Sequence, residues 1–584
     1  MSPFGSVPVA ARMHANGSLL LMFLIIIANN IVDNKETAHD TASKSERTDP
    51  IDIHEGKSMT RLNKFLVSAL AAAAIAVPLA VSSADAATLR WGSRADIYSL
   101  DPDSVPSTSN LAFLNHIYEG LIRYGPNFEI EPALATEWKL VDNKYWRFTL
   151  RKGVKFHNGA DFSADDVVAS MNRVSDPTSP LRGNIPLYAG VKKVDDFTVD
   201  IEVSAPTALF LNDMTNIFIF NAKWLKDNNA EKPTDIASKT ENYATHNTNG
   251  TGPFKLDSRV PDSKTVLIAN DQWWDEKKHN LDRIEYVPIS SAATRVAALL
   301  SNEIDLVDSA PIQDLPRLES SPGIKVSKRT ELRTVFIGFN GKEKLDDGRP
   351  NPFLDVRVRQ AVEASIDRDL INKKIMRALA RPSGSLIAPE IAGYAKTLDV
   401  FQPADPKAAQ KLLEEAGQKG LAFTYLCMND ESINEEDICS GIANMLKRAG
   451  FEPTIDMGPR AVQQPKRTNG KADMFNLSWA NEPTLDAYSL LSQVLSTRSG
   501  STGVSNYGGW SYPELDELVK KAAQEPDTAK RLALEEEALK IAKDKALLIP
   551  LHQQPIAWGM LDKVKSVDFR ADNKPRHWHT MMAE

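Results

Sequence analysis

Alternating apolar and polar residues in the stretch WRFTLRKGVKFHNGADFSADDV, residues 146–167, predict a strand, a tight turn and the start of a helix. Apolar side chains at 146, 148 and 150 alternate with polar ones, which is the period-two pattern of a half-buried strand. Asn158-Gly159 can supply the positive φ angles of a tight turn. Ser163 with Asp166 then forms the pattern of a capping box before Val167. The stretch predicts scaffold rather than chemistry.

The same kind of pattern alternates between strands and helices further along the chain. Residues 422–428 and 452–457 read as strands, and 434–449 read as an amphipathic helix that ends at Gly450, so together they predict a βαβ unit. Residues 513–523 and 527–543 predict two further helices. Because no low-complexity linker or fixed-period repeat interrupts this alternation, the predicted fold class is α/β.

The amino-terminal region contains two apolar stretches that precede the predicted fold. From Met59, the basic residues Arg61 and Lys64, an apolar core over 65–81 and the small residues 84–86 have the order of a secretory signal peptide. The earlier stretch, residues 19–28, is shorter than the roughly 20 residues that span a bilayer. We therefore interpret 59–86 as a cleaved signal peptide and 1–58 as a mis-annotated or non-native extension. A real extension with a membrane anchor is the alternative.

Composition and charge exclude several classes of function. The 584 residues are 42% hydrophobic and 25% charged, and the formal net charge of -8 gives no basic surface for nucleic acid. The two cysteines, Cys427 and Cys439, lie far from the predicted cleavage site, so we expect a soluble periplasmic chain without a lipid-modified amino-terminal cysteine. They could form a disulfide worth about 3 kcal/mol or remain a buried free pair.

No motif in the sequence indicates catalysis. The G-x-S-x-G, H-E-x-x-H, Walker A and C-x-x-C patterns are all missing from the sequence. Gly250-Thr251-Gly252-Pro253 continues into a strand-like run instead of a helix, so it lacks the helix amino terminus that binds phosphate and reads as a tight turn. We therefore expect no enzyme activity, no cofactor and no metal site.

Seven further segments accompany the stretch at 146–167 in order along the chain, namely Ser99–Pro102, Ile117–Leu121, Pro132–Trp138, Asn249–Phe254, Trp273-Trp274, Asp355–Ala361 and Trp479–Thr484. Together they resemble the extracellular solute-binding protein family 5, which includes dipeptide-, oligopeptide- and nickel-binding components of ABC importers. The stretch at 146–167 resembles the signature region of that family. These segments span nearly the whole mature chain.

This resemblance implies a two-lobe periplasmic binding protein of type II, similar to cluster C, with a subdomain inserted in the first lobe. The first lobe would comprise residues 87–131, 249–332 and 552–584, the inserted subdomain 132–248, and the second lobe 333–551. The stretch at 146–167 would then build the inserted subdomain. The chain would cross between the lobes near Phe339-Asn340 and again near His552, and the lobes would close on a solute.

The resemblance also places the ligand at the interface between the lobes. We expect contacts from the loop 93–99, the turn 249–252, the crossing at 339–340 and the segment 479–486. The residues predicted to bind ligand are Ser93, Tyr98, Ser99, Gly250, Thr251, Gly252, Phe339, Asn340, Trp479, Asn481, Glu482 and Asp486.

One position departs from the peptide-binding members of the family. In those members an Asp three residues before the acidic residue of an Asp/Glu-Pro pair binds the amino group of the peptide. Here the pair is Glu482-Pro483, and the corresponding position is Trp479. Its indole could stack on an apolar or cationic group or could pack in the core of the second lobe. Asp486 could supply the carboxylate, although capping or solvent exposure is the simpler role for it.

The function that this resemblance implies is a monomeric periplasmic protein that captures a peptide or peptide-like solute and delivers it to an ABC permease in the inner membrane. A protein that binds an opine, a sugar or a metal chelate is the alternative. An exported hydrolase or a surface-interaction protein on the same fold is a more distant one.

Overall fold

A large mixed sheet organises the part of the chain that the computed structural model describes, residues 87–583 without 106, 206, 208, 236–239, 430 and 501. The expected signal peptide at 59–86 and the residues before it lie outside the described residues. The sheet has eleven strands in the order β15-β14-β16-β12-β17-β11-β1-β10-β9-β8, with β13 paired to β17. Its strands are β1 (Thr88–Ser93), β8 (Phe254–Val260), β9 (Lys264–Ala269), β10 (Arg283–Pro288), β11 (Leu306–Val307), β12 (Ile324–Phe339), β13 (Arg381–Pro382), β14 (Ala422–Met428), β15 (Glu452–Gly458), β16 (Met474–Trp479) and β17 (Leu548–Leu561).

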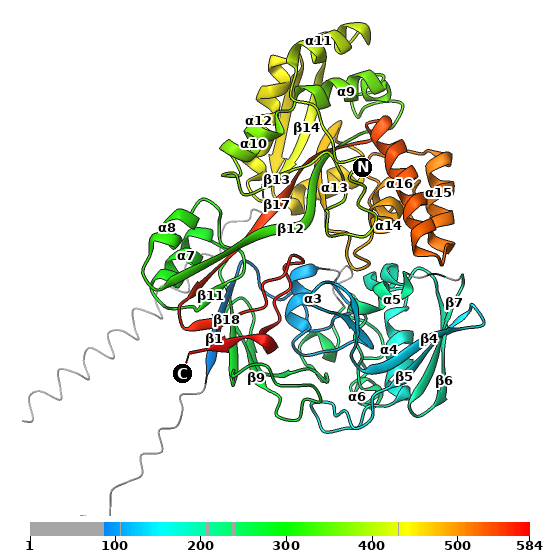
Figure 1. The fold of residues 1–584 in the computed structure, drawn as a ribbon, viewed down its shortest axis with the longest axis vertical. Helices are drawn as coiled ribbons and strands as arrows, with labels where there is room; N and C mark the ends of the chain where they lie inside the picture. Colours follow the sequence, from blue (N-terminus) through cyan, green and yellow to red (C-terminus); the bar gives the residue numbers. More distant parts are fainter. Residues whose placement is uncertain are drawn as a thin grey trace, which may run out of the picture. The chain divides into compact units, whose positions relative to one another are not determined.

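Two long antiparallel strands, β12 and β17, connect the two ends of this sheet (Figure 1). Their ladder runs from Ile324 opposite Leu561 to Gly338 opposite Leu548, and it is interrupted between Thr330 and Thr334. Such an irregularity bends a strand and redirects its side chains. The interruption therefore lies where the chain passes from one end of the sheet to the other.

Each end of the sheet contains a set of three parallel strands. At one end β1 lies parallel to both β10 and β11, and at the other β14 lies parallel to both β15 and β16. In each set the carboxyl ends of the strands therefore meet at one edge of the sheet. In open α/β sheets this edge is where ligands bind.

Helices accompany both sets of parallel strands. The helices at and after the first set are α3 (Thr108–Leu114), α7 (Ala292–Leu300) and α8 (Leu315–Ser320). Those around the second are α9 (Val356–Ser365), α10 (Arg368–Lys374), α11 (Pro406–Glu415), α12 (Glu435–Arg448), α13 (Arg460–Thr468), α14 (Ala487–Leu490), α15 (Pro513–Gln524) and α16 (Thr528–Asp544). The predicted βαβ unit is confirmed as β14-α12-β15, and both predicted carboxy-terminal helices are confirmed as α15 and α16.

The first part of the stretch at 146–167 belongs to a separate antiparallel sheet. This sheet has the order β4-β5-β7-β6, with β4 (Ala135–Val141), β5 (Tyr145–Leu150), β6 (Tyr188–Asp195) and β7 (Thr198–Val203), and α4 (Ala164–Val174) follows the predicted turn. The Asp166 carboxylate accepts hydrogen bonds from the Ser163 backbone amide at 2.8 Å and hydroxyl at 3.3 Å. The predicted strand and helix are thus confirmed, and the boundaries of an inserted subdomain stay a prediction.

The remaining elements of the amino-terminal half are short. They are β2 (Ile122–Tyr124), which pairs with β3 (Ile130–Pro132), and the helices α5 (Phe210–Asp213) and α6 (Ala222–Asp227). Near the carboxyl terminus β18 (Val564–Ser566) pairs with β19 (Met581–Met582). Among the helices that the structure describes, none combines the length and apolarity needed to cross a membrane.

Candidate functional site

A cavity of about 790 Å³ lies against the carboxyl ends of both sets of parallel strands. Arg94 follows β1 and Asp308 follows β11, while Glu431, Arg460 and Asn481 follow β14, β15 and β16, and all five residues line the cavity. A parallel strand leaves its following loop at the same edge as its neighbours, so residues distant in sequence meet there. The cavity therefore has one wall from each end of the large sheet.

The interruption of the β12–β17 ladder contributes the middle of the cavity wall. Glu331, Arg333 and Gln554 all lie at this irregularity and line the cavity. The Arg333 guanidinium donates to Glu331 Oε1 at 3.3 Å, and the Gln554 amide donates to the other Glu331 oxygen. Glu331 is thus already paired within the protein.

The wall that follows β1 and β11 combines one carboxylate with two arginines. The Trp91 indole donates to Asp308 Oδ2 at 2.9 Å, whereas Asp308 Oδ1 is buried and has no hydrogen-bond partner in the described structure. Burial raises the pKa of Asp308, and the nearby Arg295 and Arg94 oppose this rise. Burial also lowers the pKa of Arg295. This wall is therefore polar, and its two arginines outnumber its one carboxylate.

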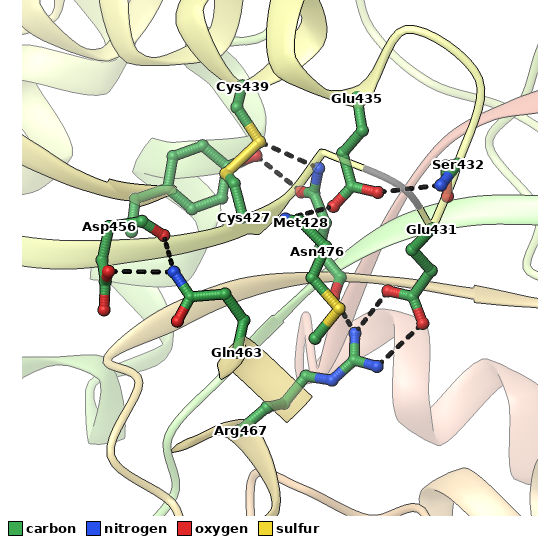
Figure 2. Close-up of a disulfide and its surroundings, with 11 residues drawn as sticks. Cys427, Met428, Glu431, Ser432, Glu435, Cys439, Asp456, Gln463, Arg467 and Asn476 are labelled. Carbon is green, nitrogen blue, oxygen red and sulfur yellow. Dashed lines mark hydrogen bonds and ion pairs between the residues drawn. A yellow bond between two sulfur atoms is a disulfide. The ribbon is translucent and has the colours of Figure 1, made fainter. Parts of the chain in front are cut away.

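The wall that follows β14 is held by an ion pair and a disulfide (Figure 2). Arg467 donates to both carboxylate oxygens of Glu431, at 2.8 and 2.9 Å. Cys427 at the end of β14 forms a disulfide with Cys439 in α12. Of the two alternatives that the sequence left open, the structure therefore contains the disulfide and not the free pair. Covalent bond and ion pair together fix the loop after β14.

The loop after β16 reaches across to residues of the amino- and carboxy-terminal segments. Thr108 donates to Glu482 Oε2 at 3.0 Å, and Lys574 pairs with the same oxygen at 3.4 Å. The Tyr124 hydroxyl donates to the Pro483 carbonyl at 2.7 Å. These contacts close the cavity on the side of the loop.

Four of the twelve residues predicted to bind ligand line the cavity: Ser93, Trp479, Asn481 and Glu482. The Trp479 indole nitrogen donates to Ser489 Oγ at 3.1 Å, so its polar atom is satisfied within the protein. Its partly buried ring remains available to a ligand. The structure brings these four residues together, and their contact with a ligand stays a prediction.

The turn at 249–252 lies elsewhere. A Cβ atom built on Gly250 would lie 2.0 Å from the Ile117 carbonyl oxygen, and Gly252 makes a similar approach to the same carbonyl. Thr251 donates to Glu119 at 2.8 Å. The close backbone approach that its glycines permit is to Ile117, and none of the residues 249–252 lines the cavity, so a contact of this turn with ligand stays a prediction.

Phe339 and Asn340 also lie away from the cavity. They lie at the end of β12, about 17 Å beyond Thr334, and the expected crossing between lobes at this place stays a prediction. Phe339 is fully buried and stacks on Phe353, and the Asn340 amide nitrogen Nδ2 donates to the Gly470 carbonyl at 3.2 Å. Both residues pack inside the region around the second set of parallel strands.

The remaining three predicted residues have structural roles or face solvent. Tyr98 is 68% exposed and does not line the cavity. The Ser99 hydroxyl accepts from the Asp101 amide at 3.1 Å within a turn. Asp486 caps α14 by accepting from the Tyr488 amide at 2.9 Å and forms an ion pair with Arg531. Capping is thus the observed role of Asp486, as the simpler interpretation had it.

Sequence reasoning included Arg94 only as part of the loop 93–99, and it missed other charged residues of the cavity wall, among them Arg295, Asp308, Glu431 and Arg467. A usable signal existed for Glu431, because it follows a strand of the predicted βαβ unit by a few residues. No comparable signal existed for Arg295, which reaches the cavity from within α7. Within the described residues no group of three or more His, Cys, Asp or Glu side chains could hold a metal ion.

Comparison with known families identifies the chain. Residues 129–502 match the family described as "Bacterial extracellular solute-binding proteins, family 5 Middle". The chain belongs to family 5. This family 5 protein is therefore the substrate-binding component of an ABC transporter, and it binds a small solute instead of catalysing a reaction.

Relatives of this family 5 protein bind different solutes. The periplasmic murein peptide-binding protein MppA of Escherichia coli is 28% identical over 486 residues, which are 78% of this chain and 85% of MppA. The probable deoxycholate-binding periplasmic protein YgiS of Escherichia coli is 28% identical over 521 residues, 84% of this chain and 92% of YgiS. The structure of the Helicobacter pylori binding protein DppA with the peptide STSA superposes with a TM-score of 0.71 at 26% identity, over 85% of this chain and 98% of DppA. The fold is that of the cluster C periplasmic binding proteins.

Proposed function

We propose that this protein captures a peptide or peptide-like solute in the periplasm and delivers it to an ABC permease of the inner membrane. The observation that carries the proposal is the cavity of about 790 Å³ whose walls come from both sets of parallel strands. Its volume lies within the range of about 300 to 1,000 Å³ that is common for small-molecule sites. Peptide-binding relatives such as MppA favour a peptide over other solutes.

The proposed mechanism is closure of two lobes around the solute. The first lobe would comprise 87–131, 249–332 and 552–584, and the second would comprise 333–551, with 132–248 as an inserted subdomain. The ladder interruption between Thr330 and Thr334 supports a passage between lobes at this place. The contacts of Thr108 and Tyr124 with the loop after β16 would form only when the lobes close. The solute would then select the closed state by binding it more tightly than the open one.

Two measurements test this proposal. Mass spectrometry of small molecules released on denaturation of the purified protein should find a peptide or an amide-containing acid. If that fraction contains a sugar, an opine or a metal chelate instead, the proposed peptide solute is wrong and the alternative solute that is found takes its place.

Small-angle X-ray scattering should show a smaller radius of gyration when the released fraction is added back to solute-free protein. An unchanged radius on addition of a fraction that binds in calorimetry would refute the closure mechanism. It would leave the solute class untouched, because the two measurements are independent.

A further inference from the structure

The three glutamates on the described cavity wall are already engaged by the protein. Glu331, Glu431 and Glu482 each pair with a cation or accept from an amide or hydroxyl group of the chain. The fourth carboxylate, Asp308, accepts from the Trp91 indole at Oδ2, its buried Oδ1 has no partner in the described structure, and two arginines lie near it. A ligand ammonium group would therefore have to compete with existing partners at the glutamates, and at Asp308 it would lie beside two guanidinium cations. The cavity is not arranged for a free amino group.

One of the two cations on the wall after β1 and β11 is free of protein partners, and the other is partly so. Arg94 is exposed at the cavity and has no hydrogen bond or ion pair with the rest of the described chain. Arg295 is 4% exposed, and its terminal nitrogens donate to the carbonyls of Ile289 at 2.6 Å, Ser290 at 3.1 Å and Ser309 at 3.4 Å. Its Nε has no partner in the described structure. This wall thus carries two guanidinium groups and only one carboxylate, that of Asp308.

An uncharged group on the opposite wall also lacks partners. Asn481 is fully buried, lines the cavity, and has no hydrogen-bond partner for either its amide oxygen or its amide nitrogen in the described structure. Buried polar atoms are normally satisfied, so such a group points to a partner that enters from the cavity. One donor beside one acceptor matches the N–H and C=O of an amide.

We propose that the solute is an acidic amide, either a short peptide or an acylated amino acid, whose carboxylate binds between Arg94 and Arg295. Its amide pairs with Asn481 from the other wall, and it needs no free amino group. This inference rests on the proposed function and gives its solute class a chemical definition. Guanidinium groups suit it because they bind carboxylates with charge-assisted, geometrically defined hydrogen bonds.

Three forms of one mixed-sequence tripeptide library test the proposal. The free, the N-acetylated and the C-amidated libraries are incubated with solute-free protein, and retained peptides are quantified by ultrafiltration and mass spectrometry. The N-acetylated library should be retained as well as the free one, because the amino group makes no required contact. With Asp and Glu left out of the library, the C-amidated form should be retained at least tenfold less, because it then carries no carboxylate.

A pair of variants assigns the effect to the cavity. Arg94→Gln should reduce retention of the N-acetylated library about tenfold and should leave the weak retention of the C-amidated library unchanged. Arg317→Gln is the matched control, since Arg317 is an exposed arginine of α8 outside the cavity. It should leave the retention of all three libraries unchanged.

The outcomes separate this inference from the proposed function. Equal retention of the C-amidated and free libraries would overturn the carboxylate site while the peptide-binding function stands. A tenfold preference for the free over the N-acetylated library would show that the protein requires a free ammonium group, which also overturns the inference. Failure to retain any of the three libraries would remove the peptide class from the proposed function and this inference with it.

Discussion

Glu435 should make the stability of this protein fall as the pH rises through neutrality. It begins α12, is only 2% exposed, and accepts from the Met428 amide at 3.1 Å and the Ser432 amide at 3.0 Å (Figure 2). Burial, together with the negative charge of Glu431, raises the pKa of Glu435 from 4.5 to about 7. Between pH 4.5 and about 7, the Glu435 carboxyl is therefore mostly protonated in the folded protein and mostly ionised in the unfolded chain.

The size of the effect follows from this pKa difference. Between pH 4.5 and 7 the folded state binds more protons than the unfolded state, so the free energy of unfolding decreases as the pH increases. For a shift from 4.5 to about 7, linkage gives a loss of about 2.5 kcal/mol between pH 5 and pH 8. Glu435→Gln cannot ionise, so the variant should lack this part of the pH dependence.

Denaturant unfolding followed by tryptophan fluorescence at pH 5 and pH 8 measures the effect. Glu436→Gln is the control, because Glu436 is the exposed neighbour on the same helix and should leave the wild-type pH dependence intact. A constant offset between wild type and Glu435→Gln is expected, since Gln has one acceptor oxygen where Glu has two. If the variant loses as much stability as wild type over this range, Glu435 does not titrate there and the reasoning fails.

Three further outcomes are expected. Replacing both Cys427 and Cys439 by Ala should lower the free energy of unfolding by about 3 kcal/mol through loss of a closed loop, and a reducing agent should destabilise wild type but not this variant. Gly250→Ala should destabilise the protein by about 1 to 3 kcal/mol in thermal unfolding, because its Cβ would overlap the Ile117 carbonyl; solute affinity in calorimetry should not change. Trp479→Asp should weaken binding of the released solute at least tenfold in calorimetric titration, because it removes a ring from the cavity wall and adds an anion. If the folded variant and wild type bind the released solute with equal affinity, Trp479 has a purely structural role.

Local pattern in the sequence determined the elements of this fold and the family to which it belongs. The period-two alternation around Phe148 and the capping pattern at Ser163 predicted β5 and α4, because strands and helix ends are set by neighbouring residues. The βαβ unit that ends at Gly458 was predicted for the same reason. The ordered family segments led to the correct class of solute-binding protein.

Tertiary structure alone decided which residues form the cavity. Arg94 and Asp308 meet because β1 and β11 are parallel neighbours, and this pairing joins residues more than 200 positions apart. Two loops that were both predicted to bind ligand lie in different places. The glycines around Thr251 pack against a neighbouring backbone, whereas Asn481 lines the cavity. Pairing between distant strands depends on the burial of whole faces, so no short window of sequence contains the information that places these side chains together.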